Sequence, residues 1–358
     1  MNGTIYMPVG EVCSSISDTY REKKNMVTLI NTSDVLEGRV LNHERVPNSN
    51  LKGQFKKTFQ RDDILYSEIR PQNRRFAYVD FSPIDYIAST KLMVIRAKKD
   101  VVSPKYLYYF LKNSSTVAEL QLLAETRSGT FPQITFSEVA NLTIPVPSLA
   151  VQEVIVQTMQ CLEDKITCNE QINDNLEATA FAIYKETFIT QNSSDWSKGT
   201  LSDLLTVKYG KDHKHLADGA IPLYGSGGIM RYVEKALYDK VSVLIPRKGT
   251  LSNVIYVDEP FWSVDTMFYT EIAKPYAAKF IYYFVKSKDL AGMDTGSAVP
   301  SMSSEIIHSM QLSIPDDDTL ISFDNRLCPL YKQIKANNQE CAKLKDLQDV
   351  LLTTISSR

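Results

Sequence analysis

The strongest constraint on the fold is an apolar repeat that occurs twice, once near the middle of the chain and once at its end. Side chains spaced alternately four and three residues apart lie on one seam of a helix, as in a coiled coil. The first series is Ile155, Met159, Leu162, Ile166, Asn169, Asn173, Leu176, Ala180 and Ile183. The second series is Phe323, Leu327, Leu330, Ile334, Asn337, Cys341, Leu344, Gln348, Leu351 and Ile355. The pattern therefore predicts two long helices.

The two series superimpose at a constant offset of 168 residues, which places Asn169 on Asn337. An asparagine in an apolar seam lowers stability but fixes the register and the partner of a helix. A single amphipathic helix packs most often on its own domain, but the matching asparagines favour two helices that pair with each other. The residues expected to form this pairing are Leu162, Ile166, Asn169, Leu176, Ile183, Leu330, Ile334, Asn337, Leu344 and Leu351.

Shorter blocks upstream of each series repeat as well. Residues 105–112 match residues 279–286, and each block follows a proline that is typical of a helix start. Tyr78-Val79-Asp80 likewise matches Tyr256-Val257-Asp258. The duplication therefore covers most of the chain, with loops of different length between the blocks.

This duplication predicts an α+β protein with a pseudo-two-fold internal repeat. Its expected segments are a first globular domain at 1–149, a long helix at 150–192, a second globular domain at 193–316 and a second long helix at 317–358. A helix of about 35 residues is roughly 50 Å long. An antiparallel pair of such helices would hold the two globular domains apart.

Composition places the chain among ordinary globular proteins. It has 358 residues, of which 43% are hydrophobic and 23% charged, and its net charge is −2. No run of eighteen apolar residues predicts a membrane span, and the first residues do not resemble a secretory signal. The five cysteines are scattered and never form a CxxC pair, which argues against a disulfide scaffold or a zinc site and suits the reducing cytoplasm.

The sequence carries no strong catalytic signature. A GxxxxGK phosphate loop is absent, and Gly225-Ser226-Gly227-Gly228 is not a GxGxxG motif that opens a helix. His213 and His215 form an isolated HxH pair, which is weak evidence for a metal site. Asp80, Asp85 and Lys91 loosely resemble a nuclease pattern that arises often by chance in a charged chain. We therefore expect a non-catalytic chain that binds no cofactor itself.

Positive charge clusters in segments predicted to be loops, and it does so in both repeats. One cluster around Arg70 and another around Lys248 occupy the same place in the repeat, just before the Tyr-Val-Asp block. Any single cluster is explained as well by a solvated loop, but recurrence favours DNA, because Arg and Lys neutralise phosphates and read guanine edges. In the first repeat, Lys52 is another of the basic residues that gather in predicted loops. The candidate DNA-binding residues are Lys56, Lys57, Arg70, Gln72, Asn73, Arg74, Arg75, Lys208, Lys211, His213, Lys214, Tyr224, Ser226, Arg247 and Lys248.

Several short motifs, taken in order, resemble the specificity (S) subunit of Type I restriction–modification systems. They are the blocks Gly129–Ile134, Ile144–Pro147, Gln152-Glu153 and Lys165–Asn169, together with the predicted strand segment Asp63–Arg70. The resemblance covers nearly the whole chain in both halves. The second copy departs from the pattern after Pro315, where three aspartates follow and the Gln-Glu pair is missing.

The resemblance implies a non-catalytic DNA reader in which each globular domain is a target-recognition domain for one half of a bipartite, asymmetric duplex site. It also implies that the paired helices set the gap and dock two methyltransferase (M) subunits, which bind S-adenosylmethionine. Motor-nuclease (R) subunits would join in complexes that cut DNA. Two alternatives are a DNA-reading or scaffold subunit of another phage-defence system, and a tandem-repeat enzyme with its site between the domains.

Overall fold

The computed structural model describes residues 4–22, 24–49, 53–127, 130–190, 196–293 and 301–356. The chain forms two compact units. The first contains residues 1–169 and 339–358, and the second contains residues 170–338. Lys52, Gly129 and the segments 191–195 and 294–300 lie outside the described residues.

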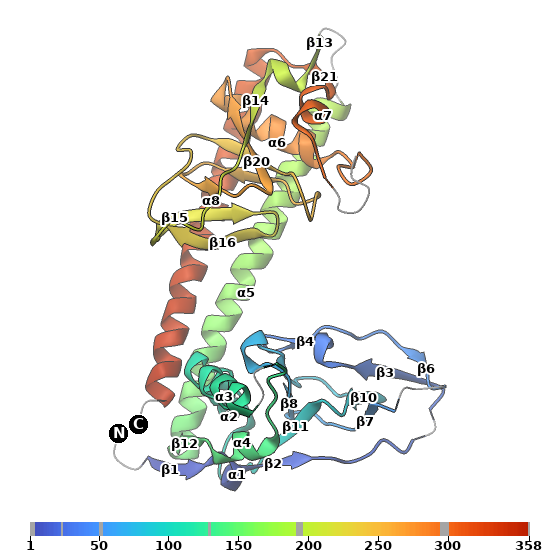
Figure 1. The fold of residues 1–358 in the computed structure, drawn as a ribbon, viewed down its shortest axis with the longest axis vertical. Helices are drawn as coiled ribbons and strands as arrows, with labels where there is room; N and C mark the ends of the chain where they lie inside the picture. The colour runs from blue at the N-terminus through green and yellow to red at the C-terminus, as the bar shows by residue number, and fades with distance from the viewer. Residues whose placement is uncertain are drawn as a thin grey trace. The chain divides into compact units, whose positions relative to one another are not determined.

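The first unit is built on two four-stranded sheets (Figure 1). One is antiparallel, with the spatial order β2 (Cys13–Ile16), β11 (Leu92–Ala97), β8 (Ile64–Ser67) and β9 (Phe76–Tyr78). The other has the order β6 (Val46–Pro47), β3 (Met26–Ile30), β10 (Tyr86–Ser89) and β7 (Phe55–Lys57), with β3 and β10 parallel. All four residues of β8 are buried, which fits its unbroken apolar run.

Two strand pairs and several short helices complete this unit. β1 (Ile5–Pro8) pairs with β12 (Thr143–Val146), and β4 (Val35–Leu36) pairs with β5 (Arg39–Val40). The tyrosine-rich helix at Pro104–Lys112, which contains the duplicated block 105–112, buries six of its nine residues and belongs to the core. The helices are α1 (Val9–Val12), η1 (Thr32–Asp34), η2 (Pro71–Asn73), α2 (Pro104–Lys112), α3 (Ser114–Arg127) and α4 (Phe136–Asn141).

The second unit repeats the strand order of the first. Its four-stranded antiparallel sheet runs β14 (Leu205–Tyr209), β20 (Met267–Ile272), β17 (Ser242–Pro246), β18 (Ile255–Val257). A three-stranded sheet runs β16 (Gly228–Val233), β15 (Asp218–Gly225), β19 (Trp262–Ser263), and β13 (Ser197–Thr200) pairs with β21 (Gln311–Ile314). The helices are η4 (Leu201–Asp203), η5 (Pro275–Ala277), α6 (Ala278–Lys286) and α7 (Ser304–His308). Within the described part of this unit, no helix corresponds to α3.

Two long helices each contribute one half to either unit. They are α5 (Leu149–Lys185), which continues as a π-helical turn at Glu186–Thr190, and α8 (Asp317–Ser356). In the first unit Asn169 of α5 donates a hydrogen bond to Glu340 of α8 over 2.7 Å. In the second unit Glu186 faces Arg326 at 3.4 Å. Partner numbers fall along α8 as they rise along α5, so the helices pair antiparallel.

The predicted fold class is therefore confirmed: an α+β protein with an internal repeat and two long, antiparallel helices. The predicted helical segments 150–192 and 317–358 contain nearly all of α5 and α8. Each of the ten residues expected to pair the helices is buried or half-buried. Asn169 is 1% exposed and Asn337 is 4% exposed, so both asparagines lie inside the seam.

Candidate nucleic-acid interface

The two basic clusters lie in equivalent loops. Arg70 stands in the loop between β8 and β9, and Lys248 stands in the loop between β17 and β18. These strand pairs occupy the same positions in the two antiparallel sheets. The clusters identified from the repeat therefore take the same structural place in each unit.

A short segment tethers the start of each loop. In the first unit, Ile69 forms a β-bridge with Gln133, and the Arg70 amide donates to the Pro132 carbonyl over 3.1 Å. In the second unit, Lys248 forms a β-bridge with Ser301. Residues 132–134 of the Gly129–Ile134 block therefore hold the start of the basic loop, a role that the short motif does not predict by itself.

In the loop of the first unit, Arg70 is exposed, whereas the other two arginines form hydrogen bonds with other parts of the protein. The Arg74 guanidinium donates to Ser114 Oγ over 2.8 Å, and the Arg75 guanidinium donates to the Ser33 carbonyl over 3.0 Å. The side chains of Gln72 and Asn73 are exposed, and only the backbone nitrogen of Gln72 donates, to Gln121 Oε1 over 3.2 Å. Arg70 is thus the cation of this loop whose side chain faces solvent, and its guanidinium forms no hydrogen bond or ion pair with the described residues.

Lys56 and Lys57 lie on β7 and differ in environment. Lys56 is exposed. Lys57 is half-buried, and its ammonium donates to the carbonyls of Thr90 at 3.0 Å and Leu92 at 2.8 Å. Burial lowers the pKa of Lys57. The ammonium of Lys57 is therefore hydrogen-bonded to backbone carbonyls within the protein, whereas the exposed ammonium of Lys56 is available to bind a ligand.

In the second unit, two loops meet at one edge. The Asn253 amide of the β17–β18 loop donates to the Ser226 carbonyl of the β15–β16 turn over 2.9 Å. Gly249 has φ +88°, and a Cβ atom there would stand 2.8 Å from Ser226 Oγ. Only glycine allows this approach without strain. Ser226 and Lys248, both predicted from sequence, are thus brought together.

Arg247 is held at the same edge. Its guanidinium donates to the Asp265 carbonyl over 3.1 Å and lies 5.4 Å from the centre of the Tyr209 ring, a cation–π contact. Tyr209 is 53% exposed. Lys248, the next residue after Arg247, is exposed. This edge therefore presents two cations and an aromatic ring, which is suited to phosphate and base contacts.

The remaining predicted residues of the second unit lie elsewhere. Lys211, His213 and Lys214 lie in the loop between β14 and β15, where Nδ1 of His213 is buried and has no hydrogen-bond partner among the described residues. Lys208 on β14 forms an ion pair with Glu271 at 3.3 Å. Tyr224 is 8% exposed and packs in an apolar cluster with Phe261. The burial of the Tyr224 ring therefore contradicts its predicted role as a DNA-binding residue.

Other chemistry is not assembled in the described parts of the chain. Lys91 is bonded to Glu68 and Gln133, while Asp85 forms an ion pair with Arg45, so the loose nuclease pattern does not converge. Among the described residues, no group of three or more His, Cys, Asp or Glu could hold a metal ion. None of the described helices is long and apolar enough to cross a membrane.

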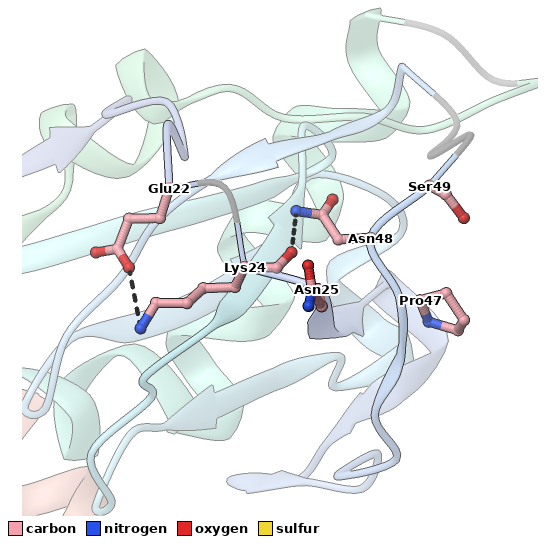
Figure 2. Close-up of a pocket in the computed structure, with 6 residues that line it drawn as sticks. All are labelled: Glu22, Lys24, Asn25, Pro47, Asn48 and Ser49. Carbon is pink, nitrogen blue, oxygen red and sulfur yellow. Dashed lines mark hydrogen bonds and ion pairs between the residues drawn. The ribbon is translucent and has the colours of Figure 1, made fainter.

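The first unit also carries a polar hollow, which Figure 2 shows in close-up. Glu22 and Lys24 form an ion pair at 3.8 Å across it, and the Asn48 amide donates to the Lys24 carbonyl over 2.9 Å. Asn25, Pro47 and Ser49 complete its lining. It contains none of the residues predicted to bind DNA.

Comparison with known proteins identifies the family. The model of the Type I restriction modification DNA specificity domain matches residues 6–178 and again residues 193–345. The chain belongs to this family. The resemblance inferred from its motifs is thereby confirmed, and the two matches correspond to the two halves of the repeat.

Individual members of the family resemble the chain to different extents. The specificity subunit of the Type I restriction enzyme HindI from Haemophilus influenzae is 40% identical over 182 residues, covering 51% of this chain and 40% of that protein. The chain thus matches less than half the length of this relative. The specificity subunit of MjaIX from Methanocaldococcus jannaschii is 24% identical over 326 residues, covering 76% of this chain and 74% of that protein.

Solved structures share the fold. The Type I restriction–modification S subunit from M. genitalium aligns with a TM-score of 0.58 at 17% identity, covering 99% of this chain and 96% of that one. A chain from a structure that describes assembly of the type I R-M system aligns with a TM-score of 0.52 at 16% identity, covering 99% and 98%. Both alignments support the two-unit α+β architecture of the specificity family.

Proposed function

We propose that this chain is the DNA-recognition subunit of a Type I restriction–modification complex and that each unit reads one half of a bipartite, asymmetric duplex site. The observation that carries the proposal is the duplicated basic loop. Arg70 and Lys248 are exposed at equivalent positions of two units that belong to a DNA-specificity family. Two similar surfaces on one chain are what a site in two separated halves requires.

The loop chemistry supports base reading as well as phosphate binding. Arginine and lysine bind the N7 and O6 acceptors of guanine in the major groove, and asparagine and glutamine bind adenine. Gln72 and Asn73 are exposed next to Arg70 in the first unit. In the second unit, Lys248 stands beside Arg247, which is already oriented by Asp265 and Tyr209. A cation held in this way, as Arg247 is, would bind DNA without losing much side-chain entropy.

We further propose that the helix pair sets the gap between the half-sites and docks two methyltransferase subunits. Exposed apolar side chains on the pair, which include Val151 and Val154 of α5 and Leu347 of α8, support a docking role. S-adenosylmethionine would be bound by those subunits, and motor-nuclease subunits would be added where the complex cuts DNA. Catalysis would then reside on other chains, and the complex would act on cytoplasmic DNA.

The proposal is tested by selecting duplexes from a random pool with the chain and its methyltransferase partner. We expect enrichment of two short blocks of defined bases separated by a constant number of undefined base pairs. No enrichment in the presence of the partner would contradict a DNA-reading role and favour a scaffold. One uninterrupted block would contradict the assignment of one half-site to each unit.

A further inference from the structure

Buried amides interrupt the apolar seam in the middle of the long helices. In the first unit, Asn169 is 1% exposed, and its Nδ2 donates to Glu340 Oε2 over 2.7 Å while its Oδ1 accepts from Lys165 Nζ at 3.1 Å. Lys165 and Glu340 also form an ion pair at 3.2 Å. Both ends of the Asn169 amide are therefore satisfied, one by each helix.

The second unit has a different amide layer. Asn337, 4% exposed, donates from Nδ2 to Asn173 Oδ1 over 2.8 Å and accepts at Oδ1 from Gln333 at 2.7 Å. Asn173 in turn donates to Asn338 Oδ1 over 2.8 Å. This layer contains only neutral groups, whereas the layer around Asn169 contains two charges. The layers are not interchangeable, because each amide has its own partners.

Apolar side chains tolerate several offsets between two helices at similar energy, but buried amides do not. A leucine finds contacts at any nearby offset, whereas a buried donor or acceptor loses its hydrogen bond as soon as its partner moves away. A polar residue in a coiled-coil seam thus specifies register at the expense of stability. Two dissimilar layers leave one register at which all of the groups are bonded.

We propose that Asn169 and Asn337, with their partners, select the single register of α5 against α8 and so restrict the protein to one spacing of half-sites. The part that concerns spacing rests on the proposed function. In this role the asparagines are positioning residues, because they act on DNA selectivity through the helices and not by contact with the duplex.

The test compares the wild type with the double variant Asn169→Leu/Asn337→Leu in complex with the methyltransferase. Duplexes carry the selected half-sites with the selected gap or with a gap one base pair longer or shorter. We expect the variant to melt at a higher temperature and still bind the selected duplex. We also expect its preference for the selected gap to fall at least fivefold. The control Asn175→Leu alters an exposed asparagine of α5 and should keep the wild-type preference.

A DNA-free measurement separates this proposal from the proposed function. Spin labels are attached to cysteines introduced at Thr179 of α5 and Lys332 of α8, two exposed residues of the second unit, and the distance between the labels is measured. The exposed Cys161 and Cys168 are replaced by serine so that they are not labelled. One narrow distance is expected in the wild type and in Asn175→Leu, and a broadened or divided distribution in the double variant. An unchanged distribution would overturn the role in register, even if the wild type binds no DNA. An unchanged gap preference would overturn the role in spacing.

Discussion

Gln152 shows how a single side chain can join a long helix to its globular unit. Its amide is fully buried, accepts from the Ser103 amide over 2.8 Å and donates to the carbonyls of Val101 at 3.1 Å and Pro147 at 2.8 Å. Ser103 is the N-cap of α2, so Gln152 links the start of α2 to α5. The residue 168 positions later is Leu320, which is 1% exposed in an apolar cluster. At this position of the repeat, the first unit therefore has a side chain that forms hydrogen bonds, and the second unit has one that packs by apolar contact.

Replacing Gln152 by leucine should destabilise the first unit. Three backbone groups would lose their partner: the buried Pro147 carbonyl, at a cost of about 1–3 kcal/mol for an unsatisfied group of this kind, and two part-buried groups, at a smaller cost because water can reach them. We expect the free energy of unfolding, measured in urea, to fall by about 2–4 kcal/mol in total. The control Leu320→Met conserves volume and should cost less than about 1.5 kcal/mol. Equal stability of Gln152→Leu and the wild type would contradict the linking role.

At this scale the sequence indicated which loops carry charge but not which cations remain free. Arg74, Arg75 and Lys57 donate to groups that are 33–42 residues away in sequence. Such partners depend on tertiary packing and leave no local pattern. Tyr224 is buried for the same reason: Phe261, whose ring contacts it, comes from a distant part of the sequence.

Among the elements, the long helices were the most predictable. Their seam is a local period, and its recurrence also indicated that the helices pair. α3 was not anticipated, because its buried side includes the polar Thr116 and Gln121, which weakens the helical pattern of apolar residues. Strands of two or three residues such as β4 and β18 are too short to show the alternation that predicts a strand.

The Asn169 layer should make the helix pair sensitive to acid. Hydrogen bonds from Asn169 and then from Lys165 lower the pKa of Glu340. A carboxylate whose pKa is lowered by folding stabilises the folded state above its unfolded pKa, and this contribution is lost as the pH falls through the folded pKa.

We therefore expect Glu340→Gln to lower the melting temperature most at neutral pH, with the difference from the wild type shrinking in acid. Melting curves from pH 7 down to pH 3 measure this. Asp346→Asn changes an exposed carboxylate of α8 that has no ion-pair partner among the described residues, and it serves as the control. A difference that grows on acidification would contradict the assigned sign.

For the whole molecule, duplication explains more than average composition does. The net charge of −2 does not suggest a DNA-binding protein, but the charge is unevenly distributed. Residues 1–150 contain 19 basic and 15 acidic residues, residues 151–192 contain 2 and 7, and residues 193–315 contain 13 of each. Residues 1–150 thus carry a net positive charge that would attract DNA, whereas residues 193–315 carry none and would depend on local cations such as Arg247 and Lys248. We expect the two units to differ in the salt dependence of binding.

If the helix pair sets the gap, lengthening it should lengthen the recognised site. One heptad added to α5 and one to α8, at positions that face each other, add roughly 10 Å of helix. This corresponds to about three base pairs at 3.4 Å per base pair. Selection from random duplexes should return the same two half-sites with a gap about three base pairs longer. New half-sites, or an unchanged gap, would contradict the spacing role of the helices.

The central claim is that each unit reads its own half-site, and the most direct test is to repeat the duplex selection with Arg70→Ala and with Lys248→Ala. Exposed lysine Lys235, outside the basic loops, provides the control Lys235→Ala. Loss of a base contact should weaken binding by about 1–3 kcal/mol and relax the sequence only where the contact was made. We predict that Arg70→Ala relaxes one half-site, that Lys248→Ala relaxes the other, and that the gap stays constant. Relaxation of the same half-site by both variants, or of neither, would contradict the account.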